Sequence, residues 1–333
     1  MQPLEISASG MVTALGLTAP ASCAAIRAGI SRVTETRFVR DGEPLSGATV
    51  PLAGEDLREK LLHMTVLAVS ECLEAVELRP DIPIILCVPE TARPGAPEGL
   101  DRRFLAALRH RVGLEPSAGG VLPLGRVGGV QALVDAGVLL ASGHERCVVA
   151  GVDSLLTAGT LTAYDLLGRL KTEDRQDGFV PSEAAAAVLL TPRSPVPDAL
   201  QCLGTGFAVE PAPYGSDEPL RAEGLFRAIR AAFEDSGCSY REIDYRITDV
   251  TGEQYSFKEA ALALSRTLRE RRPRFPMWLP AEGIGQVGAA TVPLMLGVAL
   301  AASRRGYAPG PGVLCHVSGD GRERAAVVLR VAP

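Results

Sequence analysis

The most apolar stretches of this chain form two similar segments, each a glycine-rich turn that runs into a long series of alanine, leucine and valine. Gly125 to Ala141 aligns without gaps on Gly285 to Ala301. After the turn, Asp135 is the only charged residue in either segment. A helix that is apolar all round is buried in a protein core. The pattern therefore predicts two helices that are buried on nearly every side.

An apolar strand is expected after each of these helices, and a second strand closes each copy. The first pair of strands covers Cys147 to Ala150 and Val313 to Val317, which are short apolar runs. The closing pair covers Glu183 to Leu190 and Glu323 to Arg330. The members of the closing pair are closer together in the sequence than the two helices are. This difference indicates an insertion in the first copy, around Asp153 to Arg175.

The repeated order of these elements defines the fold class. Two α/β halves that each bury a central helix require the helices to lie between sheets. We therefore expect a layered α/β fold with internal pseudo-symmetry. Its N-terminal half is expected at residues 1–195 and its C-terminal half at residues 196–333. The junction falls in the proline-rich run 192–197, which is typical of a linker.

Composition narrows the classes of function. The 333 residues are 47% hydrophobic and 22% charged, which is enough apolar material for a large core. The net charge of -5 argues against nucleic acid as a partner, because such binding rests largely on Lys and Arg. The first residues show no secretory signal, so a cytoplasmic protein is expected. The most apolar stretch, Gly288 to Ala302, is shorter than the roughly 20 residues of a membrane span, so no membrane association is expected.

Cysteine and histidine spacing points to no metal site. The seven cysteines include no C-x-x-C pair, and the four histidines include no H-x-x-x-H pair. The glycine-rich stretches lack the phosphate-loop pattern and the βαβ dinucleotide pattern. We therefore expect neither a metal nor a nucleotide cofactor.

Four short motifs, in order along the duplicated frame, resemble those of the β-ketoacyl-ACP synthases of the thiolase superfamily. The opening motif is Gly10 to Gly16, followed by Ala28-Gly29. The second is Ser142-Gly143 with Val148 to Gly151. The third, Asp177 to Ala184, is similar to the D-G-F-V-x-G-E-G signature of that family, with Ser182 and Ala184 replacing glycines. The last is the turn Ser318 to Gly321. The resemblance implies a duplicated thiolase fold with five αβαβα layers, usually homodimeric, whose active site lies where the two buried helices begin.

The family takes its acyl group on a cysteine thiolate at the head of the first buried helix. The family spacing, counted back from Gly143, places Arg126 at that position. An arginine side chain stays protonated at any relevant pH and is no nucleophile for this chemistry. Cys147, the nearest downstream cysteine, is expected in the core.

The other catalytic groups of the family are replaced as well. Its two histidines correspond to Thr251 and Gln286, its lysine to Ala281 and its gating phenylalanine to Asp320. The resemblance therefore implies a non-catalytic protein, in which Arg126 and Gln286 occupy equivalent places in the two copies.

The residues of the former pocket allow several interpretations. Arg126 at a helix N-terminus is disfavoured by the helix dipole, so it needs an acidic partner such as Glu253 or Asp320. Anion binding, and exposure of Arg126 to solvent, are the alternatives to such a buried ion pair. Gln286 is expected to form hydrogen bonds in the former cleft. His316 should lie near the same site, more simply as a core residue than as a catalyst, with Cys315 on the opposite face of its strand. A filled, closed pocket is predicted.

Three classes of function remain. The first is an accessory protein that binds a protein partner. Within that class, Glu35 to Phe38 and Gly47 to Leu52 resemble the thiolase-like proteins found beside type VI secretion effectors, which implies an adaptor or chaperone for a secreted effector. The second is a partner subunit like the chain-length factors of aromatic polyketide systems. These factors also lack the cysteine, although they are longer and usually carry glutamine at its position. The third is an acyltransferase that works through His316.

Overall fold

The computed structural model describes residues 2–52, 56–77, 79–193, 196–268 and 274–333. Ten strands form one sheet in the order β10-β9-β11-β12-β8-β1-β7-β6-β4-β5. The first five strands in chain order within this sheet are β1 (Leu4–Val12), β4 (Ile84–Cys87), β5 (Gly119–Leu122), β6 (Cys147–Ser154) and β7 (Glu183–Pro192). The second five are β8 (Leu200–Val209), β9 (Tyr245–Thr248), β10 (Met277–Trp278), β11 (Gly312–Ser318) and β12 (Glu323–Val331).

The two sets of five strands repeat one topology. From the centre outwards the order is β1-β7-β6-β4-β5 on one side and β8-β12-β11-β9-β10 on the other, so each strand has a counterpart of the same rank. The sets join through a short antiparallel contact in which Leu4 faces Cys202 and Glu5 faces Gln201. The strands predicted after each central helix are confirmed as β6 and β11. The predicted closing strands are confirmed as β7 and β12.

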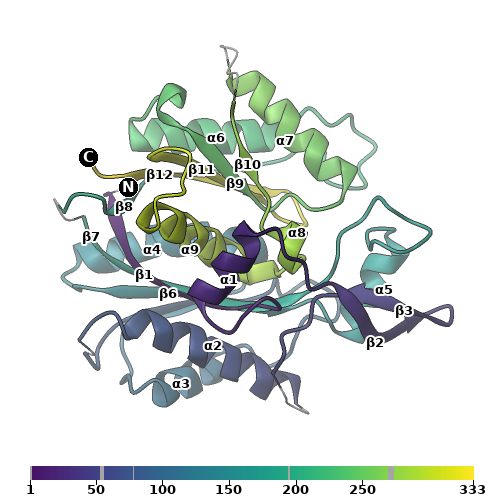
Figure 1. Cartoon of the computed structure of the whole chain (residues 1–333), viewed down its shortest axis with the longest axis horizontal. Helices are drawn as coiled ribbons and strands as arrows, with labels where there is room; N and C mark the ends of the chain where they lie inside the picture. The colour runs from purple at the N-terminus through teal and green to yellow at the C-terminus, as the bar shows by residue number, and fades with distance from the viewer. Residues whose placement is uncertain (1, 53–55, 78, 194–195, 269–273) are drawn as a thin grey trace.

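Helices cover and separate the two sets of strands in five layers (Figure 1). The outer helices are α2 (Leu57–Leu73) and α3 (Arg102–Arg111) on one side, and α6 (Glu223–Ser236) and α7 (Gln254–Thr267) on the other. Between the two sets of five strands lie α4 (Gly128–Ala141) and α9 (Thr291–Arg304). Three apolar clusters of buried residues fill the interfaces between these layers. The expected αβαβα fold class is confirmed.

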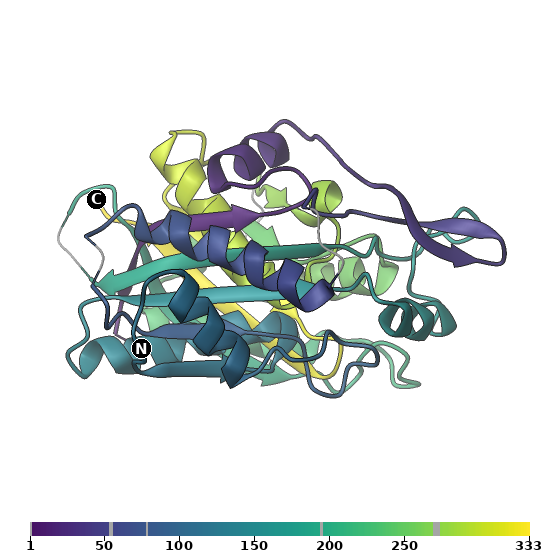
Figure 2. The same ribbon diagram turned by 90° about the horizontal axis from the view of Figure 1, so that it is seen from below.

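The remaining elements decorate this frame. They are α1 (Ala19–Arg27), the hairpin of β2 (Thr34–Arg40) and β3 (Glu43–Gly47), α5 (Ala158–Leu166) and α8 (Ala281–Ile284). The hairpin projects from one end of the molecule (Figure 2). The insertion predicted around Asp153 to Arg175 contains α5. The predicted boundary between residues 195 and 196 falls on Pro195, which lies outside the described residues.

The register of the internal repeat differs from the ungapped alignment. Each central helix follows a turn of 3-10 helix, Gly125–Val127 before α4 and Gly288–Ala290 before α9. Gly125 and Gly288 open these turns with nearly the same positive φ, 53° and 52°. The structural counterpart of Gly125 is therefore Gly288 and not Gly285, which sets Arg126 opposite Ala289. The predicted equivalence of Arg126 and Gln286 is wrong. A slip by three positions keeps nearly the same face of a helix, so apolar periodicity did not reveal it.

The two central helices are not equally buried. α9 is buried along almost its whole length, as predicted, and α1 packs against it. One face of α4, formed by Gln131, Val134, Asp135 and Val138, is not buried by the described chain, and Val138 is 66% exposed. The expectation that α4 is buried on nearly every side is therefore wrong, because no described helix covers it as α1 covers α9.

Among the described residues, no helix combines the length and the apolar character that crossing a bilayer would require.

Candidate functional site

The candidate site lies at the edge of the sheet where its parallel strands end. β4 runs parallel to β6, and β9 runs parallel to β11, so the loops that follow these strands open toward a shared edge. The turn before α4 brings Arg126 to the same place. There, the side chain of Arg126 forms ion pairs with Asp249, at 3.2 Å, and with Asp320.

Arg126 is buried with these partners, since it is only 8% exposed. Asp320 follows β11 and is one of the two acids that the sequence suggested as its partner. Asp249 follows β9 and was not foreseen in that role. Burial disfavours the charged guanidinium, but the two carboxylates outweigh it and raise the pKa of Arg126 above its ordinary value. Arg126 is therefore a permanent cation inside the site.

Asp320 is the centre of a wider network. Besides Arg126, its carboxylate accepts hydrogen bonds from Arg169, at 3.1 Å, and from the Tyr164 hydroxyl. Burial alone would raise the pKa of Asp320, but the two arginines hold that pKa well below its usual range. The carboxylate stays ionised at neutral pH and holds both arginines in place.

Glu253, the other acid suggested for Arg126, has a different partner. Its carboxylate accepts two hydrogen bonds from Arg169, at 2.7 and 3.0 Å. This geometry is the bidentate pairing that a planar guanidinium favours. Arg169 therefore connects Glu253 to Asp320, and Arg126 connects Asp320 to Asp249.

Asp249 carries the unfavourable part of the network. Burial raises the pKa of its carboxyl to about 6, although Arg126 and the Ser318 N–H act in the opposite direction. The Ser318 N–H donates to Asp249 at 3.0 Å. A carboxyl whose folded pKa is raised in this way costs stability as pH rises from about 4 through 6.

Gln286 and the two other replaced positions lie outside the ion-pair network. The Gln286 backbone pairs with the segment of the third motif, as its N–H donates to Val180 O at 2.8 Å and its carbonyl accepts from Ser182 N at 3.1 Å. Its side-chain Nε2 is buried and has no hydrogen-bond partner in the described structure. Thr251 is buried in the loop after β9, and Ala281 begins α8.

His316 does not face the former pocket. It alternates along β11 with Cys315 and Val317, which belong to the central apolar cluster. Its neighbour of the same parity, Leu314, packs in the outer cluster with α6 and α7. His316 therefore faces the outer helices, and its proposed place in the pocket is wrong. The alternation that separates Cys315 from His316 is as predicted.

The burial of His316 leads to a pH-dependent stability. Desolvation, followed by the charge of Arg246, lowers the pKa of His316 to about 3. A histidine with a depressed folded pKa stabilises the protein above its unfolded pKa of about 6.5, and this stability is lost as pH falls. Between pH 7 and 5 the loss from this residue is about 2 kcal/mol.

We expect His316→Leu to lower the sensitivity of folding to acid by that amount. Urea unfolding of the native protein and the variant at pH 7 and pH 5 measures the change. His63→Leu at an exposed histidine is the matched control and should behave as the native protein. An equal acid sensitivity in His316→Leu and the native protein would show that His316 does not titrate in this range.

The site is filled at the position of Arg126, but it is not closed. A cavity of about 580 Å³ adjoins the network, and Tyr164, Arg169 and Asp320 form part of its wall. The rest of the wall is mostly apolar and includes Pro94, Pro123, Leu124, Val127, Ala163 and Leu167. The prediction of a filled and closed pocket is therefore right for the position of Arg126 and wrong for the space beside it.

Several residues of the site were missed by sequence reasoning. Tyr164 and Arg169 belong to the insertion of the first copy, which has no counterpart in the repeat. Asp153 lies one residue before the end of β6 and accepts two hydrogen bonds from Arg93, of 2.8 and 2.6 Å. Its carboxylate also accepts the N–H of Ala289, at the structural counterpart of Arg126. The predicted elements gave no signal for Asp249, because β9 before it was not predicted, and Asp153 lies beyond the predicted strand Cys147 to Ala150.

The chain has a thiolase-like ketosynthase fold. A solved ketosynthase in complex with its chain length factor, from Xenorhabdus doucetiae, matches with a TM-score of 0.75 at 17% identity, over 99% of this chain and 98% of that one. A β-ketoacyl synthase from Burkholderia phymatum matches with a TM-score of 0.76 at 16% identity, over 100% of both chains. The ishigamide ketosynthase/chain length factor matches with a TM-score of 0.78 at 16% identity, over 99% of both chains.

Curated relatives add a more specific likeness. The chain is 28% identical, over 234 residues, to "Putative polyketide beta-ketoacyl synthase 2" of Streptomyces coelicolor, covering 63% of this chain and 55% of that protein. It is 26% identical, over 218 residues, to the protein of the same name from Streptomyces cyaneus, covering 59% and 51%. The chain spans about half the length of the curated relatives it matches. No protein-family model matches the chain.

Proposed function

We propose that this protein is a non-catalytic partner subunit of a β-ketoacyl synthase, of the chain-length-factor kind. The observation that carries the proposal is Arg126, a buried and ion-paired cation where the synthases place their nucleophilic cysteine. The helix head that would stabilise a thiolate instead holds a guanidinium between two carboxylates. Thr251 and Gln286 offer no imidazole to stabilise an oxyanion or transfer a proton.

Nearby cysteines do not replace the missing nucleophile. Cys87 and Cys147 are fully buried, and burial raises the pKa of each thiol to about 12. The thiolate is the reactive form, so less than about one molecule in ten thousand carries it at neutral pH on either residue. His316, the proposed base of an altered acyltransferase, faces another layer. The chemistry of the described residues therefore favours a binding role.

The relatives support a partner subunit over a secretion adaptor. The curated proteins described above carry names of polyketide β-ketoacyl synthases, and one solved neighbour is a ketosynthase bound to its chain length factor. No observation on the described residues favours a secreted effector. An arginine at the cysteine position, where chain-length factors usually carry glutamine, does not oppose the proposal, because both residues lack a nucleophile.

The uncovered face of α4 and the free edge of β5 provide a surface for the partner. β5 ends the strand order, so one side of its backbone is unpaired in the described structure. The face of α4 beside it presents Val134 and Val138, and Gln131 donates to Asp135 at 2.9 Å. In the other half of the fold, α1 covers the equivalent face of α9. A second ketosynthase-like chain would cover this face of α4.

Direct chemistry tests the lack of catalysis. We expect the purified protein, incubated with malonyl and acyl thioesters, to show no covalent adduct by intact mass spectrometry and no condensation product. An active β-ketoacyl synthase assayed with the same thioesters is the positive control. Formation of a condensation product by this chain alone would contradict the proposal.

Recovery of the partner tests the binding role. Affinity purification of the tagged protein from its native cell is expected to recover a β-ketoacyl synthase that retains its cysteine. Mixing the two purified subunits should then give a complex of defined stoichiometry by analytical ultracentrifugation. Recovery of a secreted effector in place of a synthase would favour the adaptor hypothesis and contradict the partner-subunit proposal.

A further inference from the structure

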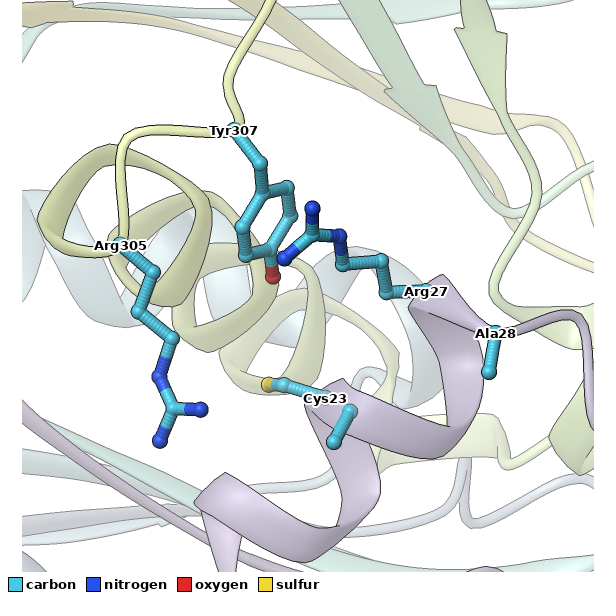
Figure 3. A pocket seen from close by; sticks show the side chains of 6 residues that line it. Cys23, Arg27, Ala28, Arg305 and Tyr307 are labelled. Carbon is cyan, nitrogen blue, oxygen red and sulfur yellow. The ribbon is translucent and has the colours of Figure 1, made fainter.

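A groove on the far side of α9 from α4 carries features that the proposed function does not use. It is formed by α1, the loop that follows α9, β10 and α8, and it consists of two adjoining cavities of about 270 and 380 Å³. Both cavities are lined by Cys23, Arg27 and Tyr307. These residues surround one hollow (Figure 3).

Two arginines with no acidic partner among the described residues face this hollow. The guanidinium of Arg27 lies over the Tyr307 ring, 4.2 Å from its centroid, and Arg305 lies on the other side (Figure 3). Neither arginine forms an ion pair with a carboxylate in the described part of the chain. In a protein with a net charge of -5, two such cations at one cavity create a local positive potential.

The side chains of Cys23 and Tyr307 carry no negative charge that would repel an anion. Burial raises the pKa of the Cys23 thiol to about 12, so it is neutral and adds no charge. Burial also raises the pKa of the Tyr307 hydroxyl, although Arg27 and Arg305 act against it, so the hydroxyl is a neutral hydrogen-bond donor. The hollow therefore offers two guanidinium groups and one hydroxyl to a carboxylate.

The second cavity is mostly apolar and aromatic. Trp278 stacks on Tyr307 with ring centroids 6.1 Å apart and an angle of 28° between the planes. Ile26, Met277 and Val298 complete its apolar wall, and Glu282 is the only acidic residue among those that line it. An aromatic ring would lie against Trp278, while a negative charge would be repelled by Glu282 and attracted by Arg27.

We propose that this groove binds a small carboxylate that carries an aromatic ring. The carboxylate lies between Arg27 and Arg305, where planar guanidinium groups favour bidentate contacts. The ring lies in the adjoining cavity against Trp278. The two cavities are of the size that small ligands occupy. This site is separate from the Arg126 network and from the uncovered face of α4.

Trp278 makes the test specific, because it is the only tryptophan of the chain. Titration of the protein with 3-phenylpropionate is expected to give a saturable change in tryptophan emission. The neutral analogue 3-phenylpropanamide is expected to bind at least about tenfold more weakly, because it lacks the charge that the arginines recognise. Absence of a saturable change with the carboxylate would overturn the proposal.

Variants of the two arginines locate the carboxylate. Arg27→Gln and Arg305→Gln are each expected to weaken binding of 3-phenylpropionate by about tenfold. Arg304→Gln is the matched control, because Arg304 instead donates to the Ser7 carbonyl, and it should bind as the native protein. Circular dichroism establishes that each variant is folded. If all three variants bind 3-phenylpropionate with the affinity of the native protein, the proposal is overturned. The titration needs no ketosynthase, so its outcome is independent of the proposed function.

Discussion

Replacing Arg126 by methionine is expected to lower the free energy of unfolding by about 3–5 kcal/mol at pH 7. Methionine fills a similar volume but leaves the buried carboxylate of Asp249 without a charged partner. Asp320 retains Arg169 and Tyr164, so Asp249 is the residue that loses most. Chemical denaturation monitored by circular dichroism measures the change.

The double variant Arg126→Met with Asp249→Asn separates loss of the ion pair from loss of packing. It is expected to recover most of the lost stability, because a neutral amide has no charge to be desolvated. Arg102→Met, at an exposed position of α3, is the matched control and should change stability by less than about 0.5 kcal/mol. If the free energy of unfolding is the same for Arg126→Met and Arg102→Met, the ion pairs of Arg126 do not stabilise the fold.

The pH dependence of the Arg126→Met effect has a defined sign. The pKa of Asp249 is raised to about 6 in the native protein, mainly by burial and against the charge of Arg126. Without Arg126 this pKa rises further, so the carboxyl becomes neutral over a wider range of pH. The destabilisation caused by the substitution should therefore be largest above pH 7 and smaller near pH 5.

Replacing Val138 by arginine is expected to weaken the proposed complex with a β-ketoacyl synthase at least about 100-fold. Val138 belongs to the uncovered face of α4 and is 66% exposed in the isolated chain. In the complex, the new guanidinium would lose its water, and the acid of this face, Asp135, already accepts a hydrogen bond from Gln131, so its burial costs several kcal/mol. The stability of the isolated chain should stay nearly unchanged, because the side chain faces solvent there.

Surface plasmon resonance with the purified synthase measures this loss of affinity. Val209→Arg is the matched control, because Val209 is also an apolar residue on the surface, 59% exposed, at the end of β8. It should bind as the native protein. Tight binding by Val138→Arg would place the partner on another surface.

The sequence was sufficient to predict much of the fold, and it was sufficient to predict that the nucleophile of the resembled family is absent. Glycine turns that lead into apolar helices, each followed by two apolar strands, have a local signal that predicts α/β halves. The resemblance also predicts, without coordinates, that Arg126 stands where the family carries its nucleophile, and charge and reactivity belong to the residue type. The sequence also offered Asp320 as an acidic partner of Arg126, together with Glu253, without choosing between them.

The register of the repeat and the direction of His316 needed the structure. A shift by three positions along an apolar helix keeps its apolar pattern, yet it decides that Ala289, and not Gln286, is the counterpart of Arg126. The side that a strand residue faces depends on how the sheet packs between helix layers. That packing places His316 against the outer helices and away from the pocket.

By itself the sequence determined the class of elements and their duplication, and it predicted that the family's reactive groups are absent, because these features depend on local periodicity and residue chemistry. Only the tertiary structure decided which acids neutralise Arg126, which face of α4 stays uncovered, and that Arg27 and Arg305 meet at one groove. These features join residues that lie far apart in the chain, such as Arg27 near its start and Arg305 near its end. Contacts at such separation are set by how layers pack, which no short segment of the chain encodes.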